Sequence, residues 1–182
     1  MSMLTLSQWL MLSFAIGSFP NDATGQHHLP ARDSAKVTKD MAITQVPLTV
    51  AIPLSDAVQR ELQTALMSEN HSITLTMRNL TPPKDANVTG FSVFVEKTDA
   101  TAATSEQEEH YVGSRAFGAK NFPQKMESHA FNVKAAFHKS RINPAEMKEI
   151  HFTFVPLSNG GKIPESTKIT FTELEISVTP KK

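Results

Sequence analysis

The side chains best suited to binding a metal in this sequence are its histidines, because the chain has no cysteine. Only two of the histidines are adjacent. No two are three or four residues apart, the spacing that places side chains on one face of a helix. The sequence therefore contains no helical metal-binding pair. The seven histidines are His27, His28, His71, His110, His129, His138 and His151.

The adjacent pair, His27 and His28, follows a segment typical of export. Residues 3–17 are apolar and uncharged, and Ala23-Thr24-Gly25 supplies the small residues that a signal peptidase recognises. We therefore expect residues 1–25 to be a signal peptide and the protein to be periplasmic or secreted. No Lys or Arg precedes the apolar segment, so the alternative is an uncleaved N-terminal membrane anchor. After cleavage we expect no membrane span.

Cleavage after Gly25 would place His28 third in the mature chain. A histidine there can bind Cu(II) in a square plane together with the terminal amine and two backbone nitrogens. Cyclisation of Gln26 would remove that amine. Copper binding by His27 and His28 is one hypothesis, and the alternative is a histidine pair in a flexible segment that holds no metal. We expect no other cofactor.

The other motifs give no catalytic residue. The sequence has no G-x-S-x-G, no phosphate-binding loop and no H-E-x-x-H. Residues 99–109 are small, polar and acidic, which is typical of a solvated loop. Lys plus Arg equals Asp plus Glu, 18 of each, so the chain lacks the basic excess of a nucleic-acid-binding protein. We expect no nucleic-acid partner and no complete active site.

The elements that would position these residues are mostly strands. Residues 26–41 are charged and lack apolar periodicity, which predicts a flexible lead-in. Apolar residues then alternate over 46–54, and Pro47 and Pro53 make this an edge strand. Ser55 is a good N-cap for a short helix. Its apolar stripe consists of Val58, Leu62, Ala65 and Leu66.

Beyond this helix the pattern predicts strands at 73–77, 91–95, 110–117, 131–135, 150–155 and 167–179. Gly113 indicates a bulge or a close backbone approach in the third of these strands. The strand at 150–155 is apolar on both faces and should be central. The parity of the last strand changes near Thr172 and Glu173, as a β-bulge would cause. Asn143-Pro144 predicts one helical turn at 145–148.

Together these elements predict an all-β protein, an antiparallel β-sandwich of about seven strands with one short helix after the first strand. The sandwich domain should span residues 42–182. The residues expected in its core are Leu48, Val50, Ile52, Ile73, Leu75, Val93, Val95, Phe152, Phe154, Leu174 and Ile176.

Five of these segments resemble, in the same order, the C-terminal β-domain that follows the copper domain in bacterial tyrosinases (polyphenol oxidases). The most specific is HYVGSRAFG at 110–118, which FNVKAAF at 131–137 follows. The resemblance extends over roughly residues 42–180. The other four segments are VPLTVAIPL (46–54), ITLTMRN (73–79), FSVFV (91–95) and FTFVP (152–156).

The resemblance implies a domain without its catalytic half. In tyrosinases a four-helix bundle holds two coppers, each by three histidines, and the histidine spacing here does not match that pattern. The resemblance also implies packing over a copper site, and Phe117 and Phe122 are aromatic candidates for a plug. For Phe117 we favour core packing. We expect a non-catalytic accessory domain, with a tyrosinase-type copper-domain protein as its partner; the alternatives are a copper-handling protein using His27 and His28, or a non-copper subunit of a split tyrosinase.

Overall fold

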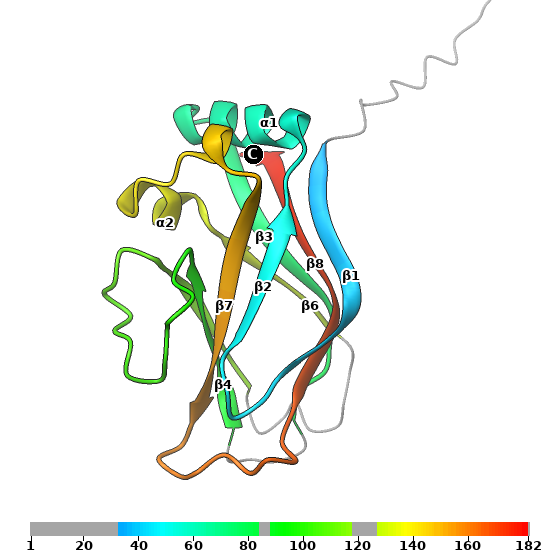
Figure 1. Cartoon of the computed structure of the whole chain (residues 1–182), viewed down its shortest axis with the longest axis vertical. Coiled ribbons are helices and arrows are strands. Elements are labelled where there is room, and N and C mark those ends of the chain that lie inside the picture. Colours follow the sequence, from blue (N-terminus) through cyan, green and yellow to red (C-terminus); the bar gives the residue numbers. More distant parts are fainter. Residues whose placement is uncertain (1–32, 84–87, 118–126, 182) are drawn as a thin grey trace, which may run out of the picture. The chain divides into compact units, whose positions relative to one another are not determined.

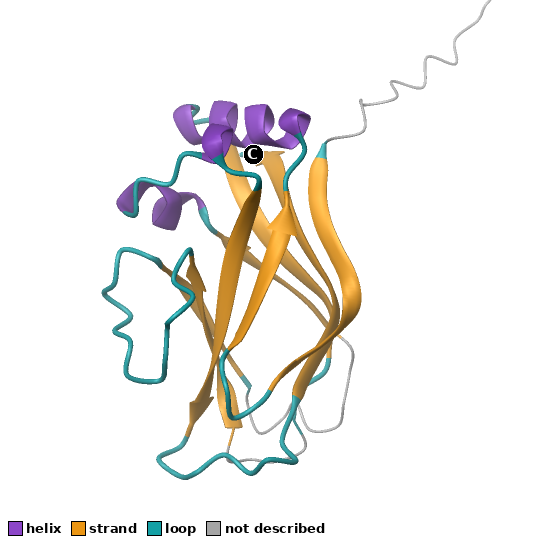
Figure 2. Cartoon of the chain, viewed as in Figure 1, coloured by secondary structure: helices purple, strands orange, loops and turns teal. Residues whose placement is uncertain are grey.

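A computed structural model describes residues 33–83, 88–117 and 127–181 of the chain (Figure 1). Two antiparallel β-sheets make up most of this part (Figure 2). Its elements, in chain order, are β1 (Ser34–Ile43), β2 (Leu48–Pro53), α1 (Asp56–Met67), β3 (His71–Leu80), β4 (Val88–Val95), β5 (Tyr111–Ala116), β6 (Glu127–Asn132), α2 (Lys134–Lys139), the 3₁₀ helix η2 (Pro144–Glu146), β7 (Glu149–Ser158) and β8 (Ile169–Pro180). The predicted all-β sandwich is confirmed.

Each sheet has four strands, in the orders β1-β8-β3-β6 and β2-β7-β4-β5. The edge position predicted for the strand around residues 46–54 is confirmed, because β2 pairs with β7 alone. The central position predicted for the strand at 150–155 is also confirmed, since β7 lies between β2 and β4. Neighbouring strands are antiparallel throughout both sheets.

The prediction of a flexible lead-in at 26–41 is wrong from residue 34 onward. β1 begins at Ser34 and pairs with β8. Ala35, Met41 and Ile43 are buried in the core, while the charged residues between them lie on the exposed face. A weak alternation of apolar residues among charged ones is enough to form a strand when the neighbouring strand supplies the backbone hydrogen bonds and half of the side-chain packing. The described part of the chain therefore has eight strands, which agrees with the expected number of about seven.

The helix after β2 is confirmed together with its cap. Ser55 has an extended backbone, and its side-chain oxygen accepts a hydrogen bond from the N–H of Val58 at 3.3 Å. Val58, Leu62 and Ala65 are buried along one face of α1. This apolar stripe holds α1 over one end of the sandwich (Figure 2).

The predicted strand at 131–135 is wrong in its second half. β6 ends at Asn132, whose side-chain oxygen accepts a hydrogen bond from the N–H of Lys134 at 3.1 Å, and α2 begins there. Val133, Ala136 and Phe137 are buried at helical spacing. The N-cap residue of α2 is Val133, which makes no side-chain capping bond, so the helical spacing of the buried residues marks the change from strand to helix. The helical turn predicted at 145–148 is present as η2, which spans Pro144–Glu146, whereas α2 was not predicted.

The predicted core is confirmed, with Leu48 only half-buried at the start of β2. Phe91, Phe152, Phe154 and Phe171 are fully buried between the sheets. Aromatic pairs link the sheets, as between Phe154 and Phe171, whose ring centroids lie 5.4 Å apart. This phenylalanine-rich core explains how the domain folds without disulfides.

The parity change predicted for the last strand is also confirmed. Ile169 and Phe171 are buried on one side of Thr172, and Leu174 and Ile176 on the other. The pairing of β8 with β1 shifts at the same place. The bulge predicted at Gly113 is confirmed as well, because the pairing of β4 with β5 shifts beside it.

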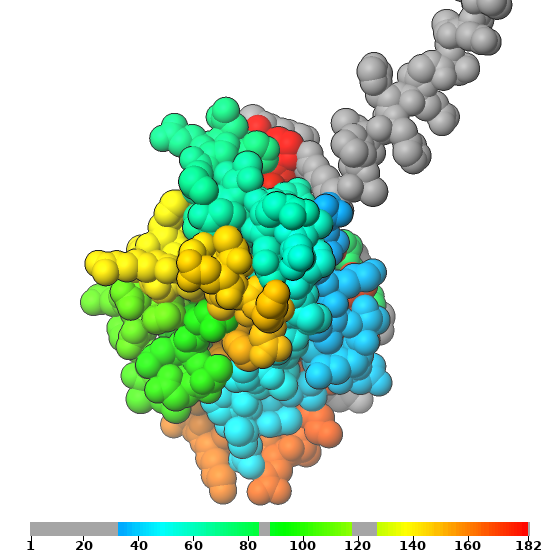
Figure 3. All heavy atoms as spheres, turned by 45° about the horizontal axis from the view of Figure 1, so that its top comes forward, coloured from blue at the N-terminus to red at the C-terminus, as the bar shows by residue number. Residues whose placement is uncertain are grey.

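The helical segments gather at one end of the sandwich. Figure 3 views this end, with the atoms of α1 beside those of the α2–η2 region. The side chain of Gln59 in α1 donates a hydrogen bond to the carbonyl of Met147, just after η2, at 2.8 Å. Within the described ranges, none of the helices is long and apolar enough to cross a membrane. The expected signal peptide, residues 1–25, lies outside the described residues.

Candidate functional site

The five described histidines lie on different parts of the fold. No three His, Asp or Glu residues within 33–83, 88–117 and 127–181 are grouped so that they could hold a metal ion. The candidate copper ligands His27 and His28 lie outside these ranges. The positions are His71 at the start of β3, His110 just before β5, His129 on β6, His138 on α2 and His151 on β7.

The most polar histidine environment surrounds His151 on β7. Its Nδ1 lies 3.4 Å from the Glu96 carboxylate and its Nε2 lies 3.3 Å from that of Glu149. The same Glu96 oxygen accepts the backbone N–H of His151 at 2.6 Å. Glu96 adopts a positive φ of 50°, a conformation that costs energy for a residue with a side chain. These contacts fix the point where the chain leaves β4.

His110 lies at the end of the loop that begins at Glu96. Its Nδ1 lies 2.8 Å from the carbonyl of Val95, and its backbone carbonyl accepts the N–H of Val95 at 2.9 Å. Within this loop, residues 99–109 were predicted to be solvated, and most of them are exposed. Ala100, however, is buried against Phe94 and Val155 on the outer face of the sheet. Glu96 and His110 therefore anchor the two ends of a loop that covers one face of the sheet.

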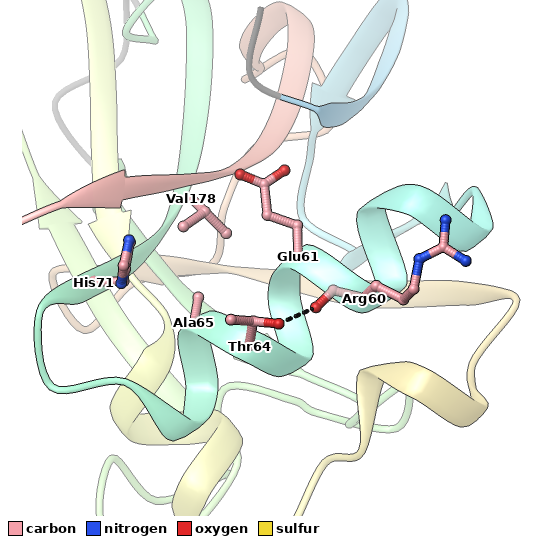
Figure 4. Close-up of a pocket in the computed structure, with 6 residues that line it drawn as sticks. All are labelled: Arg60, Glu61, Thr64, Ala65, His71 and Val178. Carbon is pink, nitrogen blue, oxygen red and sulfur yellow. Dashed lines mark hydrogen bonds between the residues drawn. The ribbon is translucent and has the colours of Figure 1, made fainter. Parts of the chain in front are cut away.

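A cavity of about 230 Å³ lies between α1 and the strands β3 and β8. Figure 4 shows its lining residues: Arg60, Glu61, Thr64, Ala65, His71 and Val178. His71 Nδ1 lies 2.9 Å from the Ser68 hydroxyl, and Thr64 donates to the Arg60 carbonyl at 2.8 Å. These hydrogen bonds are local to the helix and its end. The arrangement has no convergent set of polar groups that would orient a substrate.

A second hollow, of about 400 Å³, lies at the other end of the sandwich and has a mixed polar and apolar lining. It lies between the β1–β2 connection, the loop 96–110 and the end of β7. Val46 in that connection is 62% exposed, and Met67 at the end of α1 is 73% exposed. Single exposed apolar side chains of this kind are normal on protein surfaces and do not by themselves mark an interface. The hollow is lined by Gln45, Pro47, Thr101, Ala102, Val155, Pro156, Leu157, Ser158 and Ile163.

The outer face of the other sheet carries an ion-pair ladder. Arg78 on β3 contacts Glu173 at 2.8 Å and Glu175 at 2.9 Å, both on β8, and Lys36 on β1 lies 3.6 Å from Glu173. Partial burial would raise the pKa of Glu175, but hydrogen bonds from Arg78 and Ser34 outweigh it, so that pKa lies below its usual value. The ladder spans three neighbouring strands and is structural.

The two aromatic candidates for a plug were Phe117 and Phe122. Phe117 is buried in the core, 6.1 Å from Phe91 between ring centroids, so the core-packing interpretation is confirmed. Phe122 lies outside the described residues. The contacts of His151 with Glu96 and Glu149 were not predicted. Of these two contacts, only the one with Glu149, two residues before His151 on β7, has a sequence spacing that could have indicated it.

Neither a protein-family model nor a curated protein matches this sequence. Solved structures do match the fold. A recombinantly expressed latent aurone synthase (polyphenol oxidase) matches 78% of this chain with a TM-score of 0.51 and 14% identity. Latent apple tyrosinase matches 77% of it with a TM-score of 0.53 and 9% identity.

The matched region is a small part of both enzymes. The chain spans 26% of the length of the aurone synthase and 27% of that of the apple tyrosinase. At these identities the likeness concerns the fold. The predicted resemblance to a β-domain of the polyphenol oxidases is therefore confirmed at the level of the fold: this chain is built like one domain of those enzymes.

Proposed function

We propose that this chain is a non-catalytic accessory or interaction domain that packs against a copper phenol oxidase and modulates access to its active site. The observation that carries the proposal is the fold match, which covers most of this chain but about a quarter of each oxidase. Both matched oxidases are described as latent. A domain of this fold that covers a copper site in trans would act on the same kind of enzyme.

Two surface features support an interaction role. Val46 and Met67 expose large apolar side chains at opposite ends of the sandwich, and a hollow with a mixed polar and apolar lining adjoins Val46. The loop 96–110 presents acidic side chains above a buried anchor, Ala100. Because the sandwich core behind these features is rigid, binding through them would cost little conformational entropy.

The test is binding of the purified chain, residues 26–182, to a tyrosinase catalytic domain prepared without its own β-domain. We expect calorimetric binding and a lower rate of diphenol oxidation as the chain is added. Val46→Asp and Met67→Asp form a matched pair that places a charge at one end of the sandwich or the other. We expect one of the two to weaken binding at least tenfold. If wild type neither binds nor changes the oxidation rate, the proposal fails.

Copper handling by His27 and His28 is the alternative function. It depends on a free amine at Gln26 after export, and it predicts one Cu(II) per mature chain with a square-planar absorption spectrum. His28→Ala should abolish that signal, and His138→Ala, on the exposed face of α2, should leave it unchanged. A non-copper subunit of a split tyrosinase is distinguished by oxidation that requires both proteins together.

A further inference from the structure

A hollow of about 360 Å³ lies on the sheet that carries the ion-pair ladder, where β1, β8 and β3 are neighbours. Its volume is within the range typical of small-molecule sites. It adjoins the ladder, because Asn79 follows Arg78 and Thr172 precedes Glu173 along the chain. We call it the threonine hollow. Its lining residues are Asp40, Met41, Ala42, Asn79, Thr81, Lys168, Thr170, Phe171 and Thr172.

The threonine hollow lies where the strands lose their regular pairing. The pairing of β1 with β8 shifts just before Met41, and that of β3 with β6 shifts just before Leu80. The ladder of β3 with β8 stops after Arg78 and resumes as a single bridge between Thr81 and Thr170. Bulges re-aim side chains and are over-represented next to active sites. Irregularities of three neighbouring strands thus fall at one level of the sheet.

The side chains that face the threonine hollow are short and mostly polar. Met41, Leu80 and Phe171 are buried in the core at this level. Because side chains alternate along a strand, the residues on either side of each of them lie on the outer face. These outer residues are Asp40 and Ala42 on β1, Asn79 and Thr81 at the end of β3, and Thr170 and Thr172 on β8. Five of these six side chains are polar, and none is larger than asparagine.

Asn79 is held in a fixed orientation beside the threonine hollow. Its backbone has a positive φ of 56°, a conformation that asparagine tolerates better than most residues. Its side-chain nitrogen donates a hydrogen bond to the Thr172 hydroxyl at 2.7 Å, across the gap in the ladder of β3 with β8. The carboxamide is therefore positioned before any ligand arrives, which lowers the entropy that binding would cost.

The chemistry of the lining favours an uncharged ligand with several hydroxyl groups. Asp40 and Lys168 carry opposite charges, so the lining has no net charge. In the adjoining ladder, Arg78 and Glu173 are already paired with each other. Threonine hydroxyls and the asparagine carboxamide each donate and accept hydrogen bonds, as the hydroxyls of a sugar do. A phosphate or carboxylate ligand would require an excess of cationic groups instead.

We propose that the threonine hollow binds a neutral saccharide unit through the hydroxyls of Thr81 and Thr170 and the carboxamide of Asn79. Ala42, the one apolar side chain among the six outer residues, leaves the room that a sugar ring occupies. The inference does not rest on the proposed accessory role. A saccharide titration contains no oxidase, so the two proposals fail or succeed separately.

Amide NMR of the purified, isotope-labelled chain measures the binding. The probes are D-glucose, D-mannose and D-xylose, each as the free sugar and as its β-1,4-linked tetraose. We expect at least one probe to shift the resonances of Asn79, Thr81 and Thr170 saturably, with a dissociation constant in the millimolar range or below. Tighter binding of a tetraose supports a polymeric glycan as the ligand, and equal binding supports a single sugar unit.

Two variants with matched controls test the site. Thr170→Val removes one hydroxyl and should weaken binding about fivefold, whereas Thr76→Val, on the same face of the sheet but outside the hollow, should bind as wild type does. Ala42→Leu fills the hollow and should abolish the shifts, and Ala130→Leu, exposed on β6, should not.

The proposal is overturned if no probe shifts the resonances of the hollow, if the shifts lie elsewhere on the chain, or if Thr170→Val and Ala42→Leu bind like wild type. The sugar-free spectrum of each variant shows whether it folds. Should Ala42→Leu fail to fold, Thr170→Val and its control decide: equal affinity of Thr170→Val and wild type then contradicts the proposal.

Discussion

Arg115 and Glu127 form an ion pair of 2.9 Å between strands of different sheets. Replacing either partner leaves the other charge about two-thirds buried without its partner. We expect Arg115→Met and Glu127→Gln each to lower the free energy of unfolding by about 1 kcal/mol, the upper part of the range for partly exposed pairs. Urea denaturation of both variants and of the double variant gives the coupling energy. Additive losses would show that the pair contributes nothing as a pair.

Gly90 on β4 lies where no side chain fits. A Cβ at this position would lie 2.0 Å from the Arg115 carbonyl oxygen of the paired strand β5. Gly90→Ala must therefore displace backbone, and we expect a loss of about 3 kcal/mol or more in the free energy of unfolding. Gly161→Ala, where a Cβ meets nothing within 4 Å, is the matched control and should be neutral in the same denaturation experiment.

Strict alternation is what made the sandwich predictable from the sequence. Where apolar residues recur every second position, as at Ile73 and Leu75, the strand and its buried face follow from the sequence. β1 was missed because charged residues dilute its alternation, and its burial depends on pairing with β8. Residues 133–135 were misassigned because Val133 fits both the strand spacing with Phe131 and the helical spacing with Ala136 and Phe137. Local sequence does not contain the tertiary partner that decides such cases.

The candidate sites were less predictable than the fold. Arg115 and Glu127 are twelve residues apart in sequence and belong to different sheets, so their contact depends on how the sheets face each other. His151 and Glu96 meet through the pairing of β7 with β4. No motif spacing indicates contacts of this kind. The absence of a helical histidine pair, by contrast, could be stated from the sequence alone.

Phe152 tests the central position of β7. Its side chain is fully buried, and its strand pairs with β2 and β4. We expect Phe152→Ala to lower the free energy of unfolding by about 3–5 kcal/mol, because the cavity is enclosed on both sides. Val46→Ala, at a position 62% exposed, should change it by less than about 0.5 kcal/mol. A loss below about 1 kcal/mol for Phe152→Ala would contradict its placement in the core.

The ion-pair ladder predicts that the protein loses stability at acidic pH. Burial raises the pKa of Glu175, but hydrogen bonds from Arg78 and Ser34 outweigh it and lower the pKa in the folded protein. The ladder's contribution is therefore present above the usual carboxyl value and is lost as pH falls through the lowered one. Arg78→Met should reduce the loss of thermal stability between pH 5 and pH 3. An unchanged slope of melting temperature against pH would exclude Glu175 as its source.

Oxidation of phenols tests the non-catalytic interpretation. Oxidation of a phenol by bound dioxygen at a binuclear site requires two coppers held close together by histidines on rigid elements. The described histidines lie on four different elements and one loop, and no three potential ligands within the described ranges are grouped for a metal ion. His27 and His28 offer one adjacent pair. We therefore expect the mature chain, loaded with copper, to oxidise monophenols and diphenols no faster than free copper does.

The decisive comparison is with the His28→Ala variant after washing with a chelator. If the only tight copper is at the N-terminus, wild type should retain at most one copper per chain and the variant none. A stoichiometry of two, with diphenol oxidation that survives the chelator, would show a binuclear site and refute the prediction. Oxidation that appears only after a copper-domain protein is added would instead favour the split-enzyme alternative, because the missing ligands would then come from the partner.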